Sequence, residues 1–155
     1  IHSSFGSWGH SWSSCAVPFK RFLIGAEFDY VFTKFMGTKL DRFDGEASAR
    51  EVLKWITEDR RRNGLSKAEA REAWDAFDDV RSMAECGEHD FGTAMMDVAR
   101  SLDRRHPMHD NFADPCGWPK VTKYDMQAQG FWRQLWPLFI EALKAEAEQH
   151  ALQAA

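Results

Sequence analysis

Cysteine and histidine side chains occur in two pairs whose spacing is compatible with a zinc site. Cys86 is followed by His89 after two residues, and His106 is followed by His109 after two residues. Structural zinc sites use four nitrogen or sulfur ligands, often taken from two such pairs. This pattern supports one hypothesis, a small zinc-stabilised or metal-dependent protein that processes nucleic acid. The order of the pairs and the helix expected between them are uncommon in zinc modules, so we expect no metal or other cofactor.

Carboxylates form the second group of candidate residues. At 100° per residue, Glu69, Glu72, Asp75 and Asp79 share one face of a helix, opposite its apolar face. Residues 66–103 contain 10 acidic and 4 basic side chains, a net charge of −6, whereas the whole chain has −4. A localised acidic surface of this kind suits a basic protein partner. Most such ridges are only solvated faces, and that alternative stays open.

Aromatic side chains form the third group. The chain contains 12 Phe and 7 Trp residues, and Trp is enriched among the residues that dominate protein interfaces. Phe5, Trp8, Trp12 and Trp118 are the candidates for an exposed aromatic patch that binds a partner. The alternative is that they complete the hydrophobic core, as large aromatic side chains usually do.

Composition limits the class of protein. The 20 basic and 24 acidic residues form no basic stripe, so we expect no direct binding to duplex nucleic acid. Three scattered cysteines do not suggest a disulfide framework, and they favour a reducing compartment such as the cytoplasm. No apolar run approaches the length of a membrane span. No catalytic motif has its required context, so we expect binding rather than catalysis.

Hydrophobic periodicity predicts a mainly α fold (α+β) in which four or five helices pack around an aromatic-rich core. Pro18 begins the first helix, Asp44 caps the second, and a capping box at Ser66 and Glu69 begins the third. Pro137 predicts a kink within the last helix. The expected helices cover residues 19–36, 44–62, 66–84, about 88–103 and 125–144.

The remaining segments are predicted from glycine, proline and aromatic content. Residues 1–16 are expected to form an aromatic arm with one or two short strands, including a strand over 8–12 that could pair with 120–124. Residues 104–119 contain three prolines and predict a long irregular loop, and residues 145–155 predict a fraying tail. We expect residues 1–155 to form a single domain.

Several short motifs, spread over most of the chain, have the order seen in small uncharacterised proteins of tailed phages and prophages. They are Gly6-Ser7-Trp8 with Trp12, Phe22-Leu23, Asp29-Tyr30 with Lys34, Asp44-Gly45-Glu46, Arg60-Arg61 and Trp136-Pro137. The sequence therefore resembles that family, which has no established activity and implies no catalytic residue. Its members begin with a longer strand region that this chain lacks, so a complete N-terminal sheet is not expected.

The resemblance implies a phage context, in the cytoplasm of an infected or lysogenic cell. Small acidic phage proteins often bind a host protein, including components of defence systems. Our leading hypothesis is a non-catalytic protein that inhibits or redirects such a host protein, for example a nucleic-acid-handling complex of the CRISPR type. A structural or assembly subunit, visible as a homo-oligomer, is a further alternative.

Overall fold

The computed structural model describes residues 1–153, with side chains through residue 149. The contacts group the chain into two compact units. The first unit combines residues 1–42 with the chain from Tyr124 onwards, and the second unit is the continuous segment Phe43–Lys123. The chain therefore leaves the first unit once and returns to it once.

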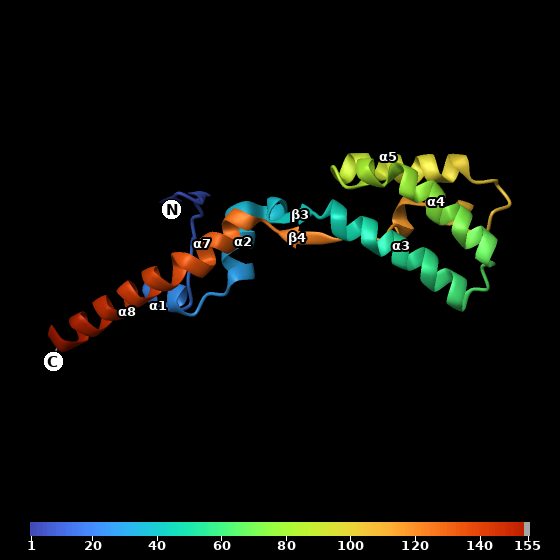
Figure 1. The fold of residues 1–155 in the computed structure, drawn as a ribbon. Coiled ribbons are helices and arrows are strands. Elements are labelled where there is room, and N and C mark those ends of the chain that lie inside the picture. The colour runs from blue at the N-terminus through green and yellow to red at the C-terminus, as the bar shows by residue number, and fades with distance from the viewer. Residues whose placement is uncertain (154–155) are drawn as a thin grey trace. The chain divides into compact units, whose positions relative to one another are not determined.

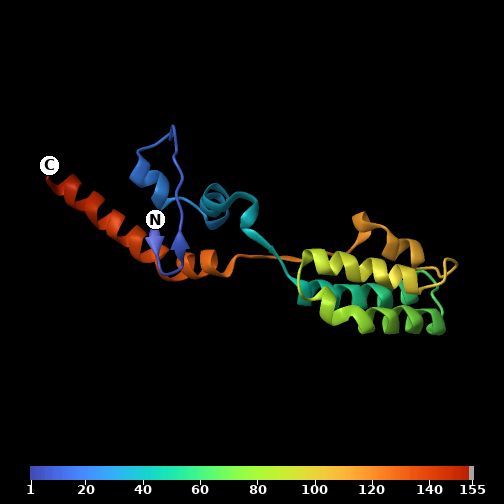
Figure 2. The same ribbon diagram turned by 90° about the horizontal axis from the view of Figure 1, so that it is seen from above.

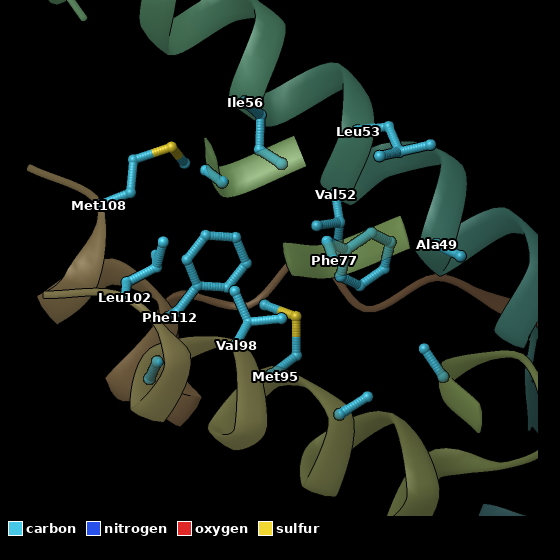
Figure 3. Close-up of a cluster of buried hydrophobic side chains, with 14 of the residues drawn as sticks. Ala49, Val52, Leu53, Ile56, Phe77, Met95, Val98, Leu102, Met108 and Phe112 are labelled. Carbon is cyan, nitrogen blue, oxygen red and sulfur yellow. The ribbon is translucent and has the colours of Figure 1, made fainter. Parts of the chain in front are cut away.

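The second unit is a helical bundle built around α3, α4 and α5, which lie side by side (Figures 1 and 2). Its helical elements are α3 (Gly45–Arg62), α4 (Lys67–Ala84), α5 (Glu88–Ser101), α6 (His109–Ala113) and the 3₁₀ turn η2 (Pro115–Gly117). Side chains from α3 to α6 point into one interior (Figure 3). Phe77, Phe91 and Phe112 are fully buried there and supply the largest apolar area.

The first unit combines both ends of the described chain. Its elements are β1 (His2–Ser3), β2 (Gly6–Ser7), α1 (Phe19–Ile24), α2 (Phe28–Met36), the 3₁₀ turn η1 (Gly37–Lys39), α7 (Met126–Gln134) and α8 (Trp136–Gln153). Phe32 of α2 is fully buried, and Phe131 and Trp136 from the C-terminal helices belong to the same hydrophobic cluster. The aromatic-rich core that the composition predicted is therefore present here.

The N-terminal caps predicted for two helices are confirmed, because in each a side chain accepts a hydrogen bond from a nearby backbone N–H. The Asp44 carboxylate accepts a hydrogen bond from the Ala47 backbone N–H at 3.1 Å and begins α3. Ser66 and Glu69 form the predicted capping box of α4. Gly37 (φ +57°) and Gly64 (φ +77°) follow helix ends in a backbone conformation that glycine adopts without strain.

Two predicted helices are each divided, so the fold is mainly α with more helices than the four or five expected. The helix predicted over 19–36 is broken between α1 and α2, where Gly25 ends α1. The last helix is interrupted at Leu135, between α7 and α8, within the region where a kink was predicted. Pro137 has no N–H to donate to the carbonyl four residues earlier, which explains this interruption.

The strands differ from the prediction in position and pairing. β1 and β2 form an antiparallel hairpin in which His2 faces Ser7, whereas residues 8–12 are not a strand. Gly6 (φ +149°) gives this hairpin a backbone conformation that other residues rarely adopt. β4 (Thr122–Tyr124) does lie in the segment expected to be extended, but it pairs with β3 (Asp41–Phe43).

Two further segments differ from the sequence prediction. Residues 104–119, expected to be irregular, contain α6 and η2. The expected fraying tail is helical through residue 153 as part of α8, and residues 154–155 lie outside the described residues. The prediction of a single domain stays a prediction, and periodicity could not indicate the two compact units because it shows which face of a helix is apolar but not which helices share a core.

Candidate protein-binding groove

The acidic residues predicted on α4 occupy different environments. Glu72 and Asp79 are exposed, and no cation contacts either of them within the described residues. Asp75 is exposed but forms an ion pair with Arg71, whose Nε lies 2.9 Å from a carboxylate oxygen of Asp75. Glu69 is half-buried and belongs to the capping box. The predicted four-residue ridge is therefore reduced to two unpaired carboxylates.

Glu72 and Asp79 line a groove of about 400 Å³ between α4 and α5. Asp97 and Ser101 of α5 line the same groove, so three carboxylates surround it. Ala76, Val80 and Leu102 add apolar surface. Asp97 forms an ion pair with Arg100 at 2.6 Å, so most of the unneutralised negative charge in the groove comes from α4. An acidic rim beside apolar surface can bind a basic side chain together with its aliphatic stem.

Glu69 acts within the fold. Its carboxylate accepts a hydrogen bond from the Ser66 backbone N–H at 2.8 Å, and its own backbone N–H donates to the Ser66 hydroxyl at 3.2 Å. The hydrogen bonds with Ser66 lower the pKa of Glu69 below its ordinary range. The Glu69 carbonyl oxygen accepts from Nε2 of the buried His106 at 3.1 Å. Glu69 therefore holds the start of α4 and does not line the groove.

The three N-terminal aromatic candidates are packing residues of the first unit. Trp8 contacts Phe32 and Phe131 edge-on, with ring centroids 5.2 and 5.4 Å apart. Phe5 packs so closely on Gly130 of α7 that a Cβ there would lie 2.5 Å from the Phe5 ring. Trp12 is half-buried in a cluster with Phe19, Phe22 and Phe35, and its indole N–H donates to the Tyr30 hydroxyl at 3.2 Å.

Trp118 belongs to the second unit, so the four aromatic candidates do not gather within one unit. Its indole N–H donates to the Phe112 carbonyl oxygen at 2.9 Å, and its ring contacts Phe91. Lys120 lies over the Trp118 ring, 5.9 Å from its centroid. All four aromatic side chains are half-buried and contact their own unit, as the alternative interpretation expected.

The four candidate zinc ligands do not form a site. Within the described residues, no group of three or more His, Cys, Asp or Glu side chains is placed to hold a metal ion. Both ring nitrogens of His106 have protein partners, because Nε2 contacts the Glu69 carbonyl and Nδ1 accepts from the Met108 backbone N–H. Cys86 is exposed, and its thiol donates to the Ser82 carbonyl. The spacing within each pair was compatible with zinc, but the fold gives the side chains of Cys86, His106 and His109 other contacts.

Sequence reasoning missed the α5 side of the groove. Asp97 and Ser101 are four residues apart and therefore share a face of α5, next to the buried Val98 and Leu102. That spacing was readable in the sequence. The sequence did not show that this face of α5 lies beside α4, because that depends on how the two helices pack.

Comparison with known protein families identifies the family to which the chain belongs. Residues 1–145 match the profile of Phage_phiTE_072, described as a phage family. The chain belongs to this phage family. The phage part of the resemblance drawn from its short motifs is thereby confirmed. Searches of curated proteins and of solved structures found no match.

No helix within residues 1–153 combines the length and the apolar character that a membrane crossing needs.

Proposed function

We propose that this phage-family protein binds a host protein through the groove between α4 and α5 and inhibits or redirects it without catalysis. The unpaired carboxylates of Glu72 and Asp79 carry the proposal. The protein's own cations leave them unneutralised, so a positively charged partner does not have to displace an internal ion pair. Electrostatic attraction of this kind raises the association rate and selects among partners.

The apolar surface of the groove supports a protein partner rather than an inorganic cation. Ala76, Val80 and Leu102 lie beside the carboxylates, so an inserted arginine or lysine can bury its aliphatic stem while its charged end meets the acids. No group of His, Cys, Asp or Glu side chains among the described residues is arranged for metal binding, which gives a bare metal ion a poorer fit.

A basic site that normally receives nucleic-acid phosphates has the charge that this groove requires. Such sites carry exposed lysine and arginine side chains in a row, and carboxylates spaced along a helix can take the place of phosphates. A host complex that handles nucleic acid, including a CRISPR-type defence complex, is therefore the proposed class of partner. The phage family supplies the biological context but names no partner.

Charge reversal in the groove tests the proposal. The double variant Glu72→Lys/Asp79→Lys should lose about tenfold or more of its affinity for a host protein that the wild type captures from lysate, because attraction becomes repulsion. Affinity should be measured by titration of the purified pair at two salt concentrations, and the wild-type complex should weaken at the higher one. Both substitutions are on exposed positions, so the melting temperature should change little.

The matched control is the double variant Asp78→Lys/Glu148→Lys, which changes the net charge equally. Both control residues are exposed and have no ion-pair partner within the described residues, and neither lines the groove. The control variant should bind like the wild type. If both variants bind equally well, the groove is not the contact surface, and if the wild type enriches no host protein at all, the host-binding function itself is wrong.

A further inference from the structure

A second cavity lies between α3 and α4, and its lining is basic and aromatic. Arg60 of α3 and Lys67, Arg71 and Trp74 of α4 surround it, with Ile56 and Ala70 adding apolar surface. Its volume is about 340 Å³, which falls within the range of sites for small organic ligands.

The cations of this cavity are not fully used by the protein. The side chains of Arg60 and Lys67 have no ion-pair or hydrogen-bond partner within the described residues. Arg71 is paired with Asp75 through its Nε, which leaves terminal N–H groups of the guanidinium available. Arg61 and Arg62 continue the same run of arginines but do not line the cavity. The arginine run therefore contributes one side chain to this cavity.

Trp74 is the aromatic residue of the cavity, and its environment is unusual in this protein. All seven Trp residues lie in the described part of the chain, and each of the other six has a ring contact with another aromatic side chain. Trp74 has none there, and its indole N–H has no acceptor among those residues. The Trp74 side chain is half-buried, so part of a large apolar side chain lines the cavity beside three cations.

We propose that this cavity binds a nucleoside phosphate. The base stacks on Trp74, and the phosphate is held by Arg60, Lys67 and Arg71. Stacking on an aromatic ring and charge-assisted hydrogen bonds to phosphate oxygens are the usual means of binding such a molecule. A simple anion would leave Trp74 unused, whereas an uncharged apolar molecule would leave the cations unpaired.

The ligand can come from two sources, a free nucleotide or the end of a single nucleic-acid strand. Neither source requires the long basic stripe that duplex binding needs. The cavity lies on the flank of α4 that faces α3, whereas the acidic groove lies on the flank that faces α5. The proposal therefore goes beyond the proposed host-protein binding, and a failure of one does not decide the other.

Calorimetric titration of the full chain tests the site with four probes at low ionic strength. The probes are adenosine 5′-monophosphate, adenosine, ribose 5-phosphate and inorganic phosphate. The nucleotide should bind saturably, and each of the other three should bind about tenfold more weakly or worse. Adenosine lacks the phosphate, ribose 5-phosphate lacks the base, and inorganic phosphate lacks both the base and the ribose. A single-stranded oligonucleotide ending in a 5′-phosphate is the fifth probe, and whichever of it and the free nucleotide binds more tightly identifies the source.

Adjacent arginines provide a matched pair of variants. Arg60→Glu should weaken nucleotide binding about tenfold or more, whereas Arg61→Glu, with the same charge change, should leave it within about twofold of the wild type. Trp74→Leu keeps apolar packing but removes the ring, so its affinity for the nucleotide should fall to that for ribose 5-phosphate. Circular dichroism and thermal melting should show that all three variants are folded.

Three results would overturn the proposal. The first is a lack of saturable binding by both the nucleotide and the oligonucleotide. The second is binding of inorganic phosphate as tight as that of the nucleotide, which would reduce the site to a cluster of cations. The third is an equal loss of binding in Arg60→Glu and Arg61→Glu, which would indicate a general charge effect rather than this cavity.

Discussion

Gly45 begins α3 at a point where the end of α4 leaves no space for a side chain. The residue is buried, and a Cβ built on it would lie 2.3 Å from the Glu85 carbonyl oxygen and 2.6 Å from the Glu85 carbonyl carbon. These are backbone atoms, which cannot rotate away as a flexible side chain can. Glycine at this position therefore allows the two helices to approach closely.

The variant Gly45→Ala should lose about 1–3 kcal/mol of unfolding free energy, because α3 or Glu85 must shift to admit the methyl group. Urea unfolding followed by circular dichroism measures this loss. Gly9→Ala is the control, since a Cβ there has no neighbour within 4 Å and should change stability by less than about 0.5 kcal/mol. Equal stability of the two variants would show that this contact does not constrain α3.

At the level of single residues, local roles were predictable and long-range contacts were not. The Asp75 ion pair with Arg71 could have been read from their spacing of four, and it would have removed Asp75 from the acidic ridge. By contrast, His106 contacts Glu69, 37 positions earlier, and nothing in the sequence around either residue indicates this contact. A histidine therefore suggested a metal ligand where the fold uses it to hold two segments together.

The ends of helices depend on individual side chains, and Asp44 at the start of α3 is the clearest case. Besides the hydrogen bond from Ala47, its carboxylate forms an ion pair with Lys123 at 3.1 Å. The Ala47 hydrogen bond and then the Lys123 contact lower the pKa of Asp44 below its ordinary value of 3.8. Because the folded pKa is lower than the unfolded one, the stabilisation is complete above 3.8 and is lost as the pH falls through the depressed value.

Asp44→Ala should therefore be less stable than the wild type by about 1 kcal/mol at neutral pH, the usual effect of losing an N-cap. The difference should narrow as the pH falls below 3.8, because the wild-type carboxylate becomes protonated. Urea unfolding at a series of pH values measures both effects. Asp44→Asn should keep most of the capping contribution to stability and lose its pH dependence. A stability difference between the wild type and Asp44→Ala that stays constant with pH would contradict this account.

The starts and breaks of helices were predictable where they depend on residues that are neighbours in the sequence. The capping box at Ser66 and Glu69 and the break before Pro137 were correctly placed because each depends on neighbours in sequence. The break at Gly25 was missed because an apolar stripe continued across it, and a glycine inside a helix costs only about 1 kcal/mol. The pairing of β3 with β4 joins segments about 80 positions apart, and only tertiary packing selects it.

For the molecule as a whole, the distribution of the two cores leads to a direct test. The second unit is one continuous segment and has its own cluster of buried side chains, so the fragment 43–123 should fold without the rest of the chain. We expect a helical circular dichroism spectrum and a cooperative thermal transition. A fragment that is unfolded, or that melts without cooperativity, would show that this unit depends on the first one.

The same fragment contains both α4 surfaces, the acidic groove and the basic cavity, because all of their residues lie between 43 and 123. The sequence predicted the acidic face of α4 as a candidate but could not show which of its carboxylates remain unpaired. The basic cavity escaped prediction because Arg60 and Trp74 lie on different helices. Both surfaces depend on the way α3, α4 and α5 pack, and that packing is long-range information.

The discontinuity of the first unit has a consequence for its biosynthesis. Residues 1–42 leave the ribosome before residues 43–123, and their core partners in α7 and α8 follow only after that segment. At about 5–20 residues per second, translation of residues 43–123 takes roughly 4–16 s. During this interval Trp8 and Phe32 lack Phe131, which contacts them in the finished protein, so the aromatic core of the first unit can close only after the second unit has been synthesised.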